Sequence, residues 1–383
     1  MTRAPNMSPR NAPRKDAAPT SLAAMHEVLR AEGGSRVVGW IGLDVPLELI
    51  EAPGFHPLQI VANPVHAPSA ADPFAEGLGH PLLKALTGTV LELAESGLER
   101  ILIGATPTLG FSLYSFLISL KRRGGTPPRL DPILVDIVRQ DSDATDRFNL
   151  LALQRLGAVL SPHLCAPALT EIIWRRNRVR DGLNAIGTQR AQGRLSGLEA
   201  LQVHAEAGSG LAHRIQHRLD QLVAELPDRV PRQGPRLVMS GGQDSAQTTY
   251  RVLEDAGFTV VADDHDAGSR AVGPAVSERG DPFAALAQRY RQRTPSPAGW
   301  STRQSAAYLV DLVQRSGAHA VVFDIPAYDH PAAWDYPARR AALDAIGVPH
   351  VLLDPHSYRD PEAAALYAVE ALQGLLADNG DRL

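Results

Sequence analysis

RLVMSGGQDSAQTTYRVLEDAGFTVVADDHDAGSR, residues 236–270, holds the strongest structural signal in the chain. Its apolar run 236–240 predicts a buried strand, and the run 258–262 predicts a second one. The segment between them has helical spacing, with Tyr250, Leu253 and Ala256 predicted to face inward. A strand, a crossover helix and a second parallel strand form one right-handed βαβ unit, and ligands bind such sheets outside the carboxyl ends of the strands. The loops SGGQDS and DDHDAGSR are both predicted to lie at that edge.

The first of these loops has the composition of a tight turn. Its glycines can adopt backbone angles that other residues rarely take, and Asp244 or Ser245 can cap the following helix. A turn of this kind suits an anion at a helix N-terminus, so the candidate binding residues are Ser240, Gly241, Gly242, Asp244 and Ser245. Close packing of the strand against the helix would also select the glycines, and both interpretations stay open.

SGGQDS also matches the SGGxDS loop of the PP-loop ATP pyrophosphatases, in which backbone N–H groups surround a pyrophosphate. This local resemblance implies an ATP-using enzyme, which is one alternative for the function.

Strands and helices alternate elsewhere in the chain as well. Strands are predicted at 36–41, 58–62, 100–104, 132–136, 320–324 and 350–354. Residues 144–226 show helical periods but no convincing strand. We therefore predict an α/β fold with two doubly wound parallel sheets. The predicted parts are a disordered tail (1–19), an N-terminal α/β domain (20–143), a helical linking region (144–233) and a C-terminal α/β domain (234–383).

Composition limits the classes of function only loosely. A net charge of -4 argues against a chain-wide attraction to nucleic acid or to an anionic membrane. No apolar run approaches the roughly 18 residues that span a bilayer, and the chain start has no signal-peptide pattern, so a cytoplasmic protein is predicted. The single cysteine, Cys165, excludes an internal disulfide and any cysteine-ligated cluster held by this chain alone.

A second resemblance covers far more of the sequence than the PP-loop does. The chain resembles the D-component family of 2-hydroxyacyl-CoA dehydratases and benzoyl-CoA reductases from about Arg36 to Leu376. Five stretches carry this resemblance in order: VVGWIGLDVPLELIEAPGFHPLQI from Val37, ILIGATPTLGFSLYSFL from Ile101, residues 236–270, GDPFAALAQRY from Gly280, and VVFDIPAYDHPAAWDYPARRAALDAIGVPHVLLD from Val321. A PP-loop enzyme would not account for the first, fourth or fifth stretch.

The resemblance implies two flavodoxin-like or Rossmann-like domains with helices around and between them, and a second, related subunit. It also implies an acyl-CoA ligand and a four-iron four-sulfur cluster bound by three cysteines, one in each of three loops. Those ligand positions fall near His80 or Pro81, near Thr106 or Pro107, and at about Tyr328. None of these residues is cysteine. Thr, Pro and Tyr do not replace soft thiolate ligands, so no cluster and no other metal is predicted in this chain.

Some residues near these loops could bind a harder metal, namely His80, His330 and Asp329, but capped or solvated loop positions are the favoured interpretation. Cys165 lies outside all three loops and is predicted to be a small buried hydrophobe.

Two further candidate residues follow from the alignment with the family. Glu48 aligns with a carboxylate near the family's substrate pocket, which implies a catalytic role, and the alternative is a charge on a helix surface. Arg270 could meet a CoA phosphate or the partner subunit, or it could form a salt bridge with an aspartate at 263, 264 or 266.

Trp334 and Tyr336 are predicted to pack rather than to bind. The family tends to carry an arginine on its last helix, where this chain has Ala368 or a neighbour.

These observations favour a cluster-free subunit of an acyl-CoA dehydratase or reductase complex, either non-catalytic or contributing a substrate pocket. An iron–sulfur cluster would then be held by a cysteine-bearing homologous subunit, although pairing of the chain with itself is the other possibility. A binding, scaffold or regulatory protein and the PP-loop enzyme remain as alternatives.

Overall fold

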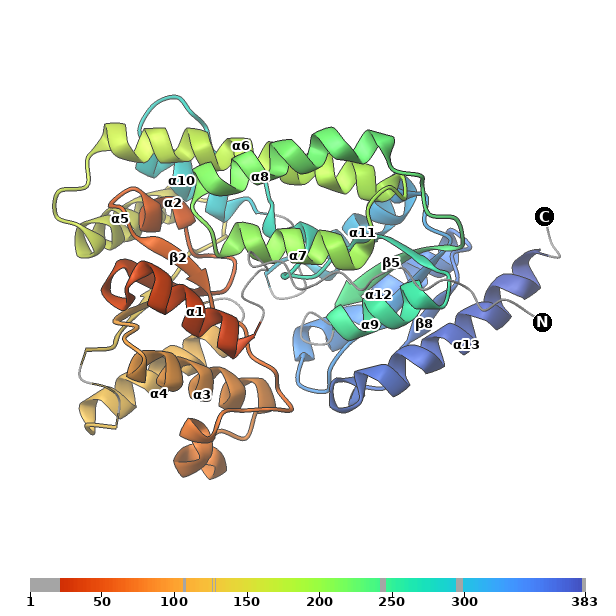
Figure 1. Cartoon of the computed structure of the whole chain (residues 1–383), viewed down its shortest axis with the longest axis horizontal. Helices are drawn as coiled ribbons and strands as arrows, with labels where there is room; N and C mark the ends of the chain where they lie inside the picture. The colour runs from red at the N-terminus through yellow and green to blue at the C-terminus, as the bar shows by residue number, and fades with distance from the viewer. Residues whose placement is uncertain are drawn as a thin grey trace, which may run out of the picture.

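The computed structural model describes residues 21–105, 108–125, 127, 129–241, 246–293 and 299–380. Among them, two parallel sheets of four strands organise the molecule (Figure 1). Sheet A has the order β2-β1-β3-β4 and consists of β1 (Val37–Ile41), β2 (His56–Gln59), β3 (Arg100–Gly104) and β4 (Asp131–Val135). Sheet B has the order β6-β5-β7-β8 and consists of β5 (Arg236–Gly241), β6 (Thr259–Asp263), β7 (Ala320–Asp324) and β8 (His350–Leu352). The two sheets thus share one topology, as the predicted α/β fold requires.

Neighbouring residues of a strand point to opposite faces of the sheet. Because apolar residues of sheet A point to both faces, helices cover both. Val37 packs with α1 (Leu22–Glu32), α3 (Pro81–Glu95) and α4 (Thr108–Arg122). Val38 faces the other way, toward a cluster built from α2 (Leu47–Glu51), α5 (Asp143–Leu160) and α10 (Pro282–Arg291). The last of these helices comes from the later part of the chain, so the two halves are interleaved.

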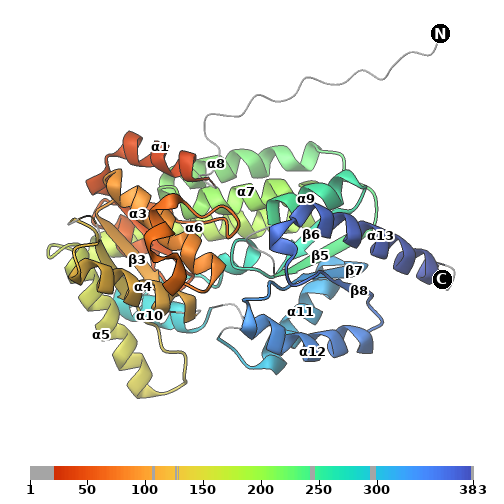
Figure 2. The same ribbon diagram turned by 90° about the horizontal axis from the view of Figure 1, so that it is seen from below.

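Sheet B is covered in the same way. Leu237 and Met239 pack against α9 (Ala246–Asp255) and α13 (Pro361–Gly380), whereas Val238 faces α11 (Thr302–Ser316) and α12 (His330–Ala345). The helices α6 (Ala166–Ala191), α7 (Gly197–Gly208) and α8 (Ala212–Glu225) pack on one another and run along one side of both sheets (Figures 1 and 2). Short 3-10 turns occur at Gly34–Arg36, Ser69–Gly77, Leu226–Asp228, Ser269–Ala271 and Ser357–Arg359.

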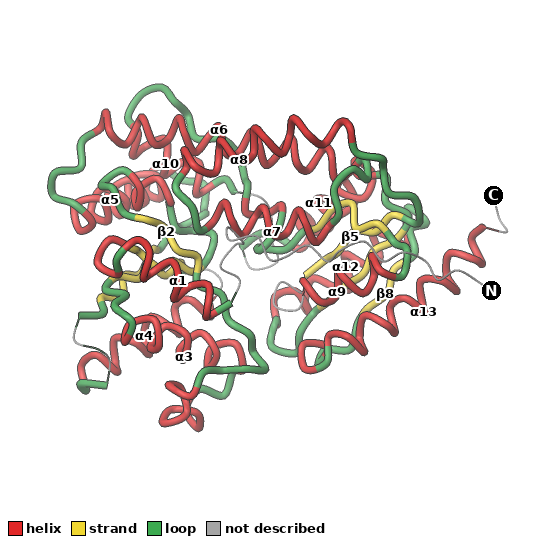
Figure 3. Tube along the Cα trace, viewed as in Figure 1, coloured by secondary structure: helices red, strands yellow, loops and turns green. Residues whose placement is uncertain are grey.

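Several element boundaries differ from the prediction. β2 begins at His56, two residues before the predicted start, and α12 begins at His330, because Asp329 caps it through Ala332 N. Within the region 144–226, which was predicted to be helical, α7 and α8 are separate helices with a break at 209–211 (Figure 3). Tyr250 and Leu253 are buried as predicted, but Ala256 is exposed.

No helix within the described ranges has the length and apolarity needed to cross a bilayer. The predicted tail, residues 1–19, lies outside those ranges.

Candidate functional site

The carboxyl ends of the two sheets face each other at the centre of the molecule. Asp44 follows β1 and pairs with Arg139, which follows β4. Asp266, which follows β6 of the other sheet, also acts electrostatically on Arg139. Since ligands of parallel α/β sheets bind outside the carboxyl ends of the strands, this shared centre is the candidate site.

A cavity of about 80 Å³ lies at this centre. Its lining includes Trp40 of β1, Val45 of the loop after β1, Leu183 of α6, and Arg289 and Tyr290 of α10. Apolar side chains form much of the wall, and Arg176 and Arg180 also line it. The cavity is large enough for a few waters or a short acyl group, and too small for a complete CoA molecule.

Glu48 lies beside this cavity and is fully buried. Its carboxylate forms an ion pair with Arg180 and accepts a hydrogen bond of 2.9 Å from the Tyr290 hydroxyl. Burial by itself raises the pKa of Glu48, but the charges of Arg180 and Arg289 outweigh burial and lower it to about 2. The interpretation of Glu48 as a surface charge is therefore wrong. At neutral pH the carboxylate is ionised, so it can accept protons or hydrogen bonds but cannot act as a general acid.

One turn further along α2, Glu51 makes the next buried ion pair. Its partner, Arg176, also donates hydrogen bonds of 2.9 Å to the carbonyls of Ala207 and Gly210. Glu51 in turn accepts a hydrogen bond of 2.8 Å from Ala212 N at the start of α8. This network joins α2, which packs on sheet A, to the helices α6, α7 and α8.

A similar network joins α6 to sheet B. Asp263, at the end of β6, pairs with Arg190, which also donates a hydrogen bond of 2.8 Å to the Val260 carbonyl. The Tyr250 hydroxyl lies 3.3 Å from Asp263 Oδ2 and 2.8 Å from His265 Nε2. Burial raises the pKa of Asp263, but the Arg190 charge outweighs burial, and the pKa lies far below its usual range. The carboxylate is a permanent charge in the core.

Arg270 is buried and contacts two aspartates, Asp266 at 3.0 Å and Asp264 at 3.7 Å. Asp264 also forms an ion pair with Arg339. The predicted salt bridge of Arg270 is therefore confirmed for these two partners.

Two residues of the SGGQDS loop are described, and they fit close packing. Gly241 has a φ of 80°, and a Cβ there would collide with the Asp324 carbonyl, so only glycine suits this position. Ser240 is fully buried, and its Oγ has no hydrogen-bond partner among the described residues. Gly242, Asp244 and Ser245 lie outside the described residues.

The family described as 2-hydroxyglutaryl-CoA dehydratase, D-component, matches residues 134–369, more than half of the chain. The chain belongs to this family. The (R)-phenyllactyl-CoA dehydratase beta subunit of Clostridium sporogenes is 23% identical over 163 residues. That match covers 43% of this chain and 43% of the relative, so less than half of the relative's length is matched. The predicted family resemblance is thereby confirmed, and residues 236–270 lie within the matched region.

At the two described positions where the resemblance implies cluster cysteines, the side chains present do not fit an iron–sulfur cluster. His80 caps α3 by accepting a hydrogen bond of 3.3 Å from Leu83 N. Its ring centre lies 4.9 Å from that of Tyr328, which lies 5.1 Å from the ring of Tyr358. The two loops that would carry cluster ligands thus meet through aromatic packing. The third position, at Thr106 or Pro107, lies outside the described residues.

No group of three or more potential metal ligands of the His, Cys, Asp or Glu type occurs in the described part of the chain. His80 and His330 are near enough for the charge of His330 to reinforce the effect of burial, which lowers the pKa of His80. Asp329 serves as the cap of α12. Cys165, predicted to be buried, is exposed before the first residue of α6, because the chain turns at the surface there.

Two aromatic predictions had different outcomes. Tyr336 packs edge-on against Phe323, with ring centres 5.1 Å apart, as predicted. Trp334 is 83% exposed and does not pack, so that prediction is wrong. Ala368 is fully buried under sheet B.

The sequence did not reveal the partners of Glu48. Arg180 lies in the run WRRNRVRD on α6, where Arg176 and Arg180 share helical spacing with the buried Ile173 and Leu183, so this spacing was a signal for an inward-facing arginine. Arg289 and Tyr290 belong to GDPFAALAQRY, one of the stretches that carries the family resemblance, and this was a second signal.

His204 provides a pH-dependent test of this buried centre. It is buried on α7 beside the cavity, and burial lowers its pKa from 6.5 to about 4. Between these values the unfolded chain binds the proton more tightly, so stability is lost as the pH falls from 6.5 toward 4 and is unaffected above 6.5. We expect His204→Gln to reduce the loss of unfolding free energy between about pH 7.5 and about pH 5 by roughly 2 kcal/mol.

Urea unfolding at the two pH values measures this loss. His217→Gln on α8 is the control, since His217 is exposed. Equal losses in the wild type and in His204→Gln would show that His204 is not held neutral in the folded state.

Proposed function

We propose that this chain is a cluster-free subunit of a 2-hydroxyacyl-CoA dehydratase-like or benzoyl-CoA reductase-like complex in the cytoplasm. The observation that carries the proposal is the ring contact of His80 with Tyr328, at two loops where the family places cluster cysteines. Membership of the D-component family and the similarity to a beta subunit support a partner-dependent role. The cluster would be held by a cysteine-bearing homologous subunit.

The central cavity supports a contribution to substrate binding. Its apolar wall suits a short acyl group, while the lining arginines Arg180 and Arg289 could donate hydrogen bonds to a thioester oxygen or carboxylate. Glu48 is engaged by Arg180 and Tyr290, so we assign it the role of holding these two groups in position. The chain would then be non-catalytic, or it would supply a pocket to a reaction centred in the partner.

Binding and assembly test this proposal together. Light scattering of the purified chain, alone and mixed with a cysteine-bearing homologue encoded beside it, measures pairing, and acyl-CoA titration of each sample measures ligand binding. We expect a dimer with an interface of at least about 1,000 Å² and saturable acyl-CoA binding to the complex. A chain that stays monomeric in both samples and binds no acyl-CoA would instead be a scaffold or regulatory protein.

The helix α5 offers the surface most suited to that pairing. Phe148, Leu151 and Val159 are each about half exposed, at 47%, 50% and 58%, and they follow one face of the helix. α5 lies at the end of the molecule away from α13 (Figure 1). We expect Leu151→Glu to weaken pairing at least about tenfold, because a charge would replace a desolvated contact.

Leu366→Glu on α13 is the matched control, since Leu366 has a similar exposure of 52%. If both variants pair as the wild type does, α5 is not the interface.

A further inference from the structure

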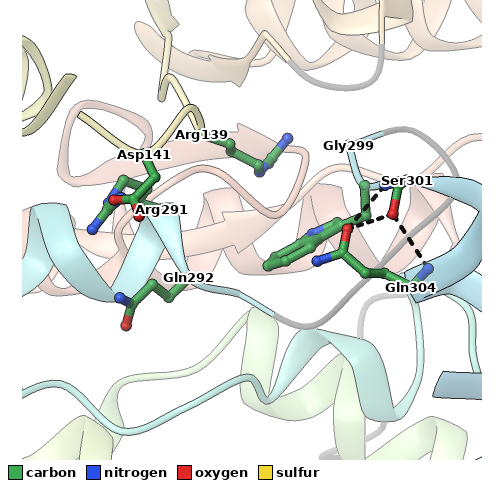
Figure 4. Close-up of a pocket in the computed structure, with 8 residues that line it drawn as sticks. Arg139, Asp141, Arg291, Gln292, Gly299, Ser301 and Gln304 are labelled. Carbon is green, nitrogen blue, oxygen red and sulfur yellow. Dashed lines mark hydrogen bonds and ion pairs between the residues drawn. The ribbon is translucent and has the colours of Figure 1, made fainter. Parts of the chain in front are cut away.

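An open cleft of about 560 Å³ lies apart from the central cavity, and the two share no lining residue. Arg139 forms its inner wall, and the end of α10 and the start of α11 form its sides (Figure 4). The lining includes Arg291, Trp300, Ser301 and Gln304. Arg291 forms ion pairs with two carboxylates, Asp141 at 2.7 Å and Asp146 at 3.1 Å. Arg139 forms an ion pair with one carboxylate, that of Asp44.

Behind the cleft, two arginines share one carboxylate. Arg139 forms an ion pair with Asp44 Oδ1, and Arg293 Nε lies 3.4 Å from the same oxygen. Arg293 is only 3% exposed. The nearby Asp266 is bound by Arg270 at 3.0 Å, and the neighbouring Arg289 donates its hydrogen bonds to backbone carbonyls. Positive charge is therefore in excess at this wall, and buried charge without a partner is costly.

Two residues that line the cleft carry hydrogen-bond donors that are not used within the described residues, namely Arg139 Nε and Trp300 Nε1. Behind the lining, Arg293 Nη1 and Asp44 Oδ2 are also buried without a hydrogen-bond partner among those residues. Buried polar groups in native proteins nearly always have a partner. Unused donors on Arg139 and Trp300, beside a surplus of positive charge, fit an oxyanion.

We propose that this wall binds the phosphate group of a phosphate monoester. A phosphate monoester carries up to about two negative charges and three terminal acceptor oxygens, which suits the surplus of positive charge and the separate guanidinium and indole N–H groups better than a carboxylate does. The cleft is much larger than a phosphate ion, so the remainder of the ligand has room in it. This site does not depend on the proposed function, because inorganic phosphate is its first probe.

The test uses the full chain and inorganic phosphate at constant ionic strength, with chloride as the reference anion. We expect phosphate to raise the melting temperature saturably, since a ligand of the folded state stabilises it. Arg139→Gln should weaken phosphate binding at least about tenfold, the worth of one charge-assisted hydrogen bond. Arg315→Gln is the control, because Arg315 is an exposed arginine on α11 outside the cleft. Stabilisation no greater than that by chloride, or an unchanged affinity in Arg139→Gln, would overturn the proposal.

Trp300→Phe provides a second variant in case Arg139→Gln does not fold. It removes the indole N–H and keeps an aromatic ring, and it should weaken phosphate binding several-fold; an unchanged affinity would count against the site. Succinate binding as tightly as phosphate would overturn the choice of phosphate over carboxylate.

Competition identifies the source of the phosphate group. Displacement of phosphate by CoA but not by dephospho-CoA would support the site and assign it to the CoA 3′-phosphate. Displacement by neither would support a different phosphate monoester, whereas equal displacement by both would overturn a site for a monoester.

Discussion

Asp263→Asn is expected to lower the free energy of unfolding by about 3–5 kcal/mol, because it leaves Arg190 as an uncompensated buried charge. Both side chains are almost completely buried, at 0% and 3% exposure. Asn could still accept the hydrogen bond of 2.7 Å from Ser269 N, but it carries no charge to balance the guanidinium. Urea unfolding near neutral pH measures the change.

A surface pair provides the matched control for this variant. Asp255 is 72% exposed and lies 3.7 Å from Arg251 on α9. Asp255→Asn removes the same charge and should cost less than about 1 kcal/mol, as exposed pairs do. Similar losses in the two variants would mean that the Asp263–Arg190 pair does not tie α6 to sheet B.

Glu48→Gln is expected to cost about 3 kcal/mol of unfolding free energy, because Arg180 and Arg289 would then lie close together without the carboxylate. A double variant tests the pairing of Glu48 with Arg180 more directly. In the double variant Glu48→Gln with Arg180→Met, part of the loss should be recovered, since Arg180 no longer leaves a buried charge without its partner, whereas Arg289 keeps its charge.

Glu27→Gln, an exposed glutamate on α1, controls for the loss of a carboxylate. A double variant that is as unstable as the sum of the two single variants would contradict the coupling of Glu48 with Arg180. Acyl-CoA titration of the double variant then separates stability from ligand binding.

The repeated sheet topology was predictable because buried parallel strands leave plain apolar runs, as in Val321–Phe323. Residue type indicates helix caps such as Ser301 of α11 and Asp329 of α12, which begins at His330. The interleaving of the halves could not be foreseen, since nothing in the sequence of α10 indicates which sheet it covers.

The contacts of the candidate site were harder to predict from the sequence than the fold. Arginines are most often at the surface, so a pattern-based interpretation places Arg180, Arg190 and Arg293 there, whereas their burial depends on acids more than 70 residues away in the chain. Cys165 shows the opposite error, because cysteine is usually buried and here lies exposed before α6. Helical spacing can indicate that an arginine such as Arg180 faces inward, but the acid that pairs with it depends on tertiary structure.

Anaerobic reconstitution tests the central claim most directly. The chain, alone and paired with a cysteine-bearing homologue, is incubated with iron and sulfide and passed through gel filtration, and iron content and visible absorbance are measured. Cys165→Ser is included to remove adventitious binding at the exposed thiol. The account predicts a colourless chain alone and, in the pair, iron in proportion to the homologue. A stoichiometric iron–sulfur absorbance that stays with the isolated chain would contradict it.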